Sequence, residues 1–146
     1  MDTAGQAQHA ADDALRGAIN ALPRALRTLH KALVDVETQY FGTVGSPLEH
    51  VQLLANHPHF AWLQVLSAMM AELDEWLDAV ADGKAALTVD SAANWRAAIE
   101  ALVGPGAPVP PQFRQKYTPL LHDSPDVAIA HGALRAALAA LPHKAG

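Results

Sequence analysis

The chain has 146 residues, a formal net charge of −5 and no cysteine. This length suits one domain with its own hydrophobic core, and the lack of cysteine excludes disulfides, thiolate metal sites and cysteine nucleophiles. The negative charge argues against a general nucleic-acid-binding protein, because such proteins need a basic surface. We therefore expect a single domain over residues 1–146, with residues 1–8 frayed and no nucleic acid as partner.

The N-terminal segment MDTAGQ has neither the basic region nor the apolar stretch of a secretory signal. The sequence contains no run of about eighteen apolar residues, so no membrane span and no membrane partner are expected. Both features predict a cytoplasmic protein.

The first expected helix has the most regular pattern in the sequence. Its apolar residues are spaced alternately four and three apart, which is typical of a long helix in a bundle. Pro23 lies inside this pattern and predicts a kink near Asn20 and Ala21, because proline cannot donate a backbone hydrogen bond. The helix is expected to end at residues 42–45, and its apolar seam consists of Leu15, Ile19, Leu22, Leu26, Leu29, Leu33, Val36 and Tyr40.

The segment SPLE then predicts the start of a short helix that ends near Ala55. The Ser46 side chain can accept a hydrogen bond from the Glu49 N–H group, and the Glu49 carboxylate can accept one from the Ser46 N–H group. This reciprocal arrangement is a capping box, and the proline between them suits the first helical position.

A long helix is expected from Pro58 to residue 82, followed by Gly83 as its C-terminal stop. Its apolar seam is Leu63, Leu66, Met70, Leu73, Leu77 and Val80. Three tryptophans and two methionines are expected in the core, and any that stay exposed would mark a partner surface, namely Trp62, Trp76, Trp95, Met69 and Met70.

Two further helices and a connecting helix complete the pattern. Asp90 or Ser91 is expected to cap a helix, residues 104–111 (GPGAPVPP) to form a loop, and Pro125 to open the last helix. The apolar residues of the connecting helix are Phe113, Tyr117, Leu120 and Leu121, and the last seam is Val127, His131, Leu134, Leu138 and Leu141. The predicted fold is all-α, a four-helix-type bundle with a kinked first helix and short connecting helices.

Two segments with the same layout bear on the histidines around Pro58. LLANHPHFAWL (53–63) and LLHDSPDVAIA (120–130) share both leucines, the proline and one alanine without a gap. His57 stands where the second segment has Ser124, a good helix N-cap. This comparison favours a capping or surface role for His57 over metal binding.

The sequence contains no motif of a known metal centre or catalytic site. No glutamate has a histidine three residues later, His-x-x-x-His is absent, and so are Gly-x-Ser-x-Gly and the phosphate-binding glycine loops. We therefore expect no catalytic residue, no metal site and no cofactor, which favours a non-enzymatic role.

His131 is the exception, because it lies on the apolar seam of its helix. A histidine there must be hydrogen-bonded within the core or serve as a ligand or acid–base group. Four other polar residues flank core positions on two other helices, namely His30, Glu37, Ser67 and Asp74. One interpretation is a buried polar network that sets the helix register. The other is a pocket for a small ligand or a metal ion.

Three segments resemble a set of short, uncharacterised bacterial proteins. They are LHKALVDVE (29–37), HPHFAWLQVLSAMMAELDE (57–75) and DSPDVAIAHGALRAAL (123–138). The set shares LH-x-x-L-x-D-x-E, P-x-FAWL-x-x-LS and DP-x-V-x-x-AH-x-x-LR segments, with arginine where this chain has Gln64. The resemblance implies a bacterial cytoplasmic helical protein but no reaction. The polar positions it shares are His30, Asp35, Glu37, Ser67, Asp74, His131 and Arg135.

The sequence thus supports two functional hypotheses. The first is a non-enzymatic structural or regulatory module that acts through protein contacts, as a homodimer or with a protein partner. The alternative is a bundle that binds a small ligand or metal ion through a buried cluster of histidine and carboxylate groups.

Overall fold

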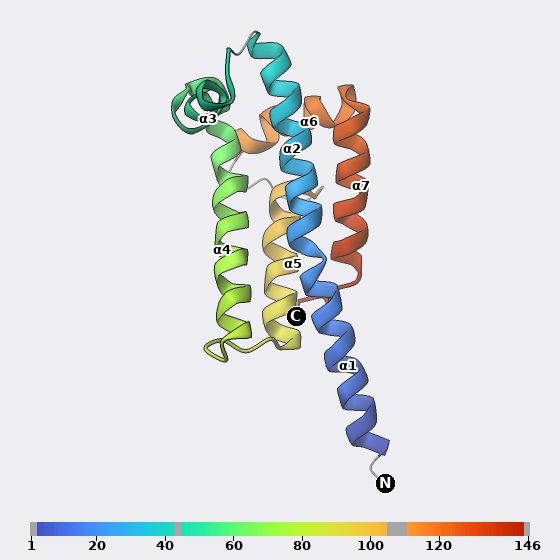
Figure 1. Ribbon diagram of the computed structural model, residues 1–146. Coiled ribbons are helices and arrows are strands. Elements are labelled where there is room, and N and C mark those ends of the chain that lie inside the picture. Colours follow the sequence, from blue (N-terminus) through green and yellow to red (C-terminus); the bar gives the residue numbers. More distant parts are fainter. Residues whose placement is uncertain (1–2, 43–44, 105–110, 145–146) are drawn as a thin grey trace.

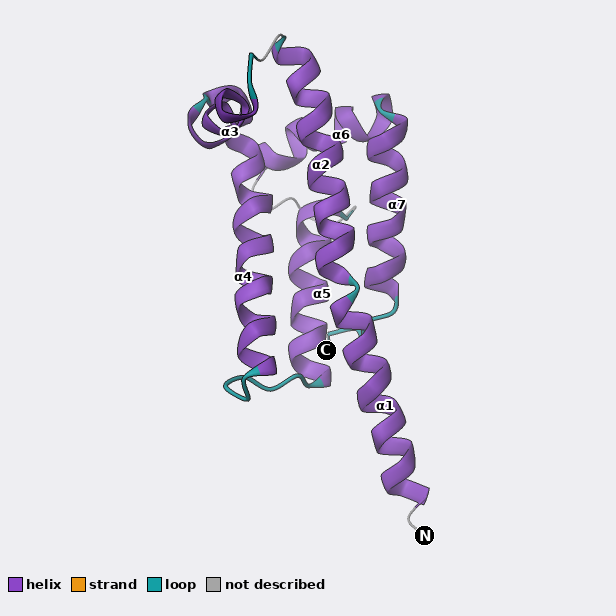
Figure 2. Ribbon diagram, viewed as in Figure 1, coloured by secondary structure: helices purple, strands orange, loops and turns teal. Residues whose placement is uncertain are grey.

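The computed structural model describes residues 3–42, 45–104 and 111–144, of which Pro111 only in its backbone. This part of the chain is helical and contains no strand (Figure 2). The elements are α1 (Thr3–Asn20), α2 (Leu22–Phe41), α3 (Pro47–Asn56), the 3₁₀ helix η1 (Pro58–Leu63), α4 (Gln64–Ala81), α5 (Val89–Val103), α6 (Pro111–Asp123) and α7 (Pro125–Ala139).

The long helices α2, α4, α5 and α7 run lengthwise beside one another (Figure 1). α2 packs against both α7 and α4 and so lies between them. α6 crosses one end of this group, and α3 is seen almost end-on beside the same end (Figure 1). At the other end α1 projects beyond the body of the molecule. No helix in the described ranges is both long and apolar enough to cross a membrane.

The predicted kink of the first helix is confirmed. α1 ends at Asn20, α2 begins at Leu22, and Ala21 between them donates its N–H to the Ala18 carbonyl oxygen at 3.3 Å, three residues back. Pro23 lacks the N–H that would bond the carbonyl of Ile19, so the regular ladder is interrupted at this point.

The helix starts follow the predicted chemistry with two corrections. Ser46 accepts from the Glu49 N–H at 3.1 Å as expected, but the Glu49 carboxylate accepts from the Gly45 N–H at 3.2 Å instead of the Ser46 N–H. α5 is capped by Thr88 and not by Asp90 or Ser91. Thr88 and Ser91 each accept from the other's N–H group, at 3.0 and 2.8 Å, because serine at the third helical position can act where glutamate usually does.

The helix predicted from Pro58 begins as the 3₁₀ helix η1 and becomes α-helical only at Gln64. His57 caps η1, since its Nδ1 atom accepts from the His59 N–H at 3.1 Å, and Ser124 caps α7 by accepting from the Val127 N–H at 3.3 Å. The matched positions of the two similar segments are therefore both N-caps. Gly83 follows α4 with φ of +76°, the left-handed conformation that suits a helix stop. Most of the predicted 104–111 loop lies outside the described residues.

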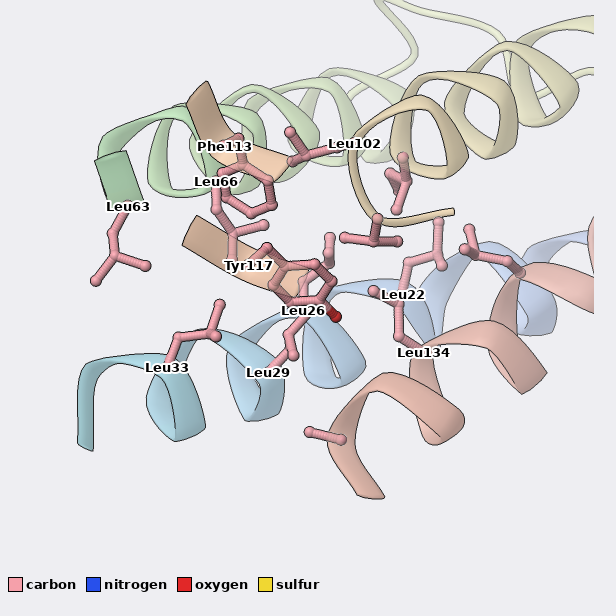
Figure 3. Close-up of a cluster of buried hydrophobic side chains, with 14 of the residues drawn as sticks. Leu22, Leu26, Leu29, Leu33, Leu63, Leu66, Leu102, Phe113, Tyr117 and Leu134 are labelled. Atoms are coloured by element: carbon pink, nitrogen blue, oxygen red, sulfur yellow. The ribbon is translucent and has the colours of Figure 1, made fainter. Parts of the chain in front are cut away.

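The core is built around α2 and reaches into α6 (Figure 3). Phe113 and Tyr117 of α6 are buried, which inserts two aromatic rings between the long helices. The tryptophans pack at its margin and are only partly buried. Tyr40, the last residue of the predicted first seam, is 64% exposed, because α2 extends past its packing partners there. Four leucines of α2 are fully buried, namely Leu22, Leu26, Leu29 and Leu33, and they continue the apolar face that begins at Ile19 of α1.

Candidate functional site

The structure divides the five predicted polar residues among separate places. His30 meets Ser67, Glu37 meets Trp62 and His59, and His131 meets Tyr117. Asp74 is exposed on α4, and its side chain has no hydrogen-bond or ion-pair partner in the described part of the chain. The single cluster expected from the sequence is therefore not formed, because residues seven apart on one helix stand two turns apart along its axis.

His30 and Ser67 join α2 to α4. Nε2 of His30 lies 3.0 Å from Oγ of Ser67, and that hydroxyl also donates to the Leu63 carbonyl oxygen at 3.3 Å. Since a serine hydroxyl has one hydrogen, Nε2 of His30 is the donor to Ser67. Burial lowers the pKa of His30 below its ordinary value, which keeps the ring neutral at pH 7.

Glu37 is the one buried charged residue in the described ranges, with 7% of its surface exposed. The Trp62 indole N–H donates to its Oε2 atom at 2.9 Å, and Nε2 of His59 lies 3.5 Å from the same oxygen. His59 Nε2 also lies 3.0 Å from the backbone oxygen of Glu37. A carboxylate placed between an indole and an imidazole is satisfied without a ligand. These contacts tie the end of α2 to η1.

Aromatic rings surround the η1 histidines and hold them in place. Phe41 lies 4.8 Å from His57, 5.6 Å from His59 and 5.5 Å from Phe60, measured between ring centroids. His50 of α3 is engaged separately, with Nε2 2.9 Å from the Thr38 hydroxyl. In the described ranges no three histidine, aspartate or glutamate side chains are grouped so that they could hold a metal ion.

Tyr117 and His131 form a close pair between α6 and α7. The tyrosine hydroxyl lies 2.6 Å from Nδ1 of His131. Burial raises the pKa of Tyr117 far above its ordinary value, with a small opposing effect from Arg114, so the phenol keeps its proton. Burial, and then the charges of Arg135 and Arg114, lower the pKa of His131. The neutral imidazole therefore accepts from Tyr117 at Nδ1 and carries its own hydrogen on Nε2.

Arg114 stands out among the charged residues near this pair. Its Nε and Nη2 atoms are buried and have no hydrogen-bond partner within residues 3–42, 45–104 and 111–144. A guanidinium stays charged at any ordinary pH. Deprotonation therefore cannot relieve the loss of solvation free energy that comes with burying part of it. Arg135 lies one turn after His131 on α7 and lines a hollow of about 120 Å³ together with Arg96 and Glu100 of α5.

The sequence did not indicate that Trp62, His59 and Tyr117 take part in polar contacts. The two aromatic residues were assigned to the core, although a buried indole or phenol normally needs a polar partner. That rule indicates that a partner exists but does not name it. Glu37 precedes Trp62 by 25 positions in the chain, so only the packing of η1 on α2 reveals the pair.

No protein-family model, curated protein or solved structure matches this chain.

Proposed function

We propose that this protein is a non-enzymatic cytoplasmic module that acts through protein contacts and forms a homodimer. The proposal includes the finer fold assignment, a four-helix-type bundle of α2, α4, α5 and α7. In this view the long helices form a stable body, and the elements at its ends are available for partners.

The observation that carries the proposal is the surface of α3. None of its ten residues is buried, and the side chains of Leu48 and Val51 are 68% and 62% exposed. α3 packs mainly on η1 and is held by two side-chain hydrogen bonds, one between His50 and Thr38 and one from Gln64 to the Ala55 carbonyl oxygen. A firmly placed helix with aliphatic side chains directed at solvent is typical of an interaction surface.

The distribution of charge favours a second copy of the chain as the occupant of this surface. α3 carries one formal charge, Glu49, and its carboxylate is bonded to the Gly45 N–H group. α4 instead exposes a group of acids without a base among them, which are Glu72, Asp74, Glu75 and Asp78. Because the whole chain is acidic, two copies repel each other least where charge is sparse, and a two-fold axis through α3 pairs this surface with itself.

The alternative from the sequence, a pocket of histidine and carboxylate groups for a ligand or metal ion, has weaker support. His30, Glu37 and His131 already have protein partners, and these partners lie in three different contacts. A pocket would need their polar atoms to converge on one space.

Sedimentation velocity across a concentration series tests the proposal. The chain is expected to sediment as a dimer, and the double variant Leu48→Glu, Val51→Glu as a monomer with unchanged helix content. Glutamate in the first turns of a helix is tolerated because it complements the helix dipole, so the variant keeps α3. Ile129→Glu is the matched control, since Ile129 is 72% exposed on α7. A monomeric parent chain, or equal effects of both substitutions, contradicts the proposal.

A further inference from the structure

We propose that the hollow between the last turn of α1 and the last turn of α4 binds a small aliphatic carboxylate, a fatty acid of medium chain length. The hollow has a volume of about 320 Å³, within the range of small-molecule sites. It lies at the end of the molecule opposite α3, near the connection from α4 to α5 (Figure 1). The proposal therefore concerns a different surface from the α3 dimer interface and does not depend on it.

The apolar part of the hollow comes from three elements. Beyond the bend between α1 and α2, α1 diverges from the body of the molecule, and within Thr3–Asn20 only Ile19 is buried. The aliphatic side chains that share the hollow with it are only partly buried, namely Leu77 and Val80 of α4 and Leu87 of the connection to α5. An aliphatic chain placed among them excludes water from apolar surface on both sides, which favours its binding.

The polar part of the hollow is on α1. Arg16 and Asn20 both line it, and because they are one turn apart their side chains lie on the same face of the helix. Arg16 has no ion-pair partner in the described part of the chain, and Asp12, one turn before it, accepts from the Gln8 amide at 3.0 Å. A guanidinium group and a carboxamide N–H group are suitable donors to the two oxygens of a carboxylate.

The charge around the hollow favours a ligand with a single negative charge. Among the described residues that line it, Arg16 is the one charged residue. Val80 and Ala81 belong to the last turn of α4, and the C-terminal end of a helix carries a partial negative charge. This end opposes a phosphate group, with about two negative charges, more strongly than a carboxylate with one. The site therefore favours a carboxylate over a phosphate.

The volume limits the length of the aliphatic chain. One water molecule takes about 30 Å³ of liquid, so about 320 Å³ holds roughly ten groups of this size, as many as the non-hydrogen atoms of octanoate. The carboxylate lies against Arg16 and Asn20 at the exposed rim, where it keeps part of its hydration. The chain then extends along Leu77 and Leu87, where its burial contributes most of the binding free energy.

Calorimetric titration and methyl NMR test the site with octanoate, with octan-1-ol as the uncharged probe and with inorganic phosphate as the anion without a chain. Octanoate is expected to bind saturably with a dissociation constant below about 1 mM, octan-1-ol more weakly and phosphate not at all. Octanoate is also expected to shift the methyl signals of the residues that line the hollow, Ile19, Leu77, Val80 and Leu87. Phosphate binding as tight as that of octanoate, or methyl shifts that leave out these residues, contradicts the proposal.

Arg16→Met decides whether the ligand's charge is recognised. This change at an exposed position is expected to weaken octanoate binding by roughly tenfold, as for loss of one charged hydrogen bond, and to leave octan-1-ol binding unchanged. Arg27→Met, at an exposed position of α2 away from the hollow, is the matched control and changes neither. The proposal is overturned if octanoate does not bind, if octan-1-ol binds equally well, or if Arg16→Met binds octanoate as the native chain does.

The two proposals can fail independently. The double variant Leu48→Glu, Val51→Glu changes the α3 surface and is expected to bind octanoate as the native chain does. A native chain that is monomeric but binds octanoate contradicts the dimer and supports this site, whereas a dimer that does not bind octanoate has the opposite meaning.

Discussion

The hydroxyl group of Tyr117 lies 2.6 Å from Nδ1 of His131, and this contact joins α6 to α7 at the end of the molecule where α6 crosses the long helices. The pair explains why a histidine is tolerated on the apolar face of α7. Ala130 and Leu134 take the buried positions around it, while His131 itself stays half-buried with its Nδ1 atom satisfied.

Tyr117→Phe tests this contact. The change keeps the buried ring but removes the donor to Nδ1, so the free energy of unfolding is expected to fall by about 1–2 kcal/mol. Urea unfolding followed by circular dichroism measures the loss. Tyr40→Phe is the control, because Tyr40 is exposed and its replacement changes nothing. Nitrogen NMR of His131 at pH 8 is expected to show the form protonated on Nε2, which changes to a mixture in the Tyr117→Phe variant.

Glu37 offers a second test, which separates charge from hydrogen bonding. Glu37→Gln keeps an acceptor for the Trp62 indole and is expected to cost less than ~1 kcal/mol, whereas Glu37→Ala leaves the indole unpaired and costs about 2–3 kcal/mol. Urea unfolding monitored by tryptophan fluorescence gives both values. Glu72→Ala, at an exposed acid on α4, is the control. Equal losses for the two Glu37 variants would show that the indole contact contributes nothing.

The two histidines with lowered pKa values predict how stability depends on pH. Folding lowers the pKa of His30 and of His131 below 6.5, the ordinary pKa of histidine. As the pH falls below 6.5, these two residues therefore take up protons in the unfolded chain before they do so in the folded chain. The contribution of these two histidines to the free energy of unfolding is therefore expected to be constant above pH 6.5. Below pH 6.5 it is expected to decrease until both rings are protonated in the folded chain too. Urea unfolding between pH 8 and pH 5 measures the slope.

Glutamine at both positions is expected to flatten this dependence. The double variant His30→Gln, His131→Gln loses two groups whose pKa is lower in the folded chain than in the unfolded chain. The double variant His9→Gln, His143→Gln, at exposed positions, is expected to keep the dependence of the native chain. An unchanged slope in the first variant would show that other groups control it.

The cap of α5 provides a fourth test. Thr88→Ala removes the acceptor for the Ser91 N–H group and is expected to lower the free energy of unfolding by about 1 kcal/mol. Asp90→Ala removes only a favourable charge in the first turn and is expected to cost ~0.3–0.5 kcal/mol. Thermal unfolding compares them directly. A larger effect of Asp90→Ala would show that Asp90, one of the two residues expected from the sequence, caps the helix instead of Thr88.

Much of the helical framework was predictable because its signals are local. The kink before Pro23, the stop at Gly83 and the N-caps at Ser46, His57 and Ser124 each depend on residues within one turn of one another. Thr88 was not predicted as the N-cap of α5, because Asp90 and Ser91 nearby are also good N-cap residues. Only the backbone conformation determines which of these residues caps the helix.

The candidate sites were far less predictable. Heptad spacing placed His30, Glu37 and His131 beside the core, but spacing along one helix does not determine the height at which a second helix meets it. Glu37 and His131 therefore do not contact each other. Glu37 is hydrogen-bonded to Trp62, and His131 is hydrogen-bonded to Tyr117.

The sequence by itself determined which segments become helices, where they begin, and which faces are apolar, because hydrogen bonding within a helix and solvent exclusion act over a few residues. Only the tertiary structure decided which polar groups meet, since that depends on how neighbouring helices are offset when their side chains interlock. The clearest instance is Arg114, an ordinary charged residue in the sequence. In the folded chain two of its nitrogen atoms are buried and have no hydrogen-bond partner within the described residues.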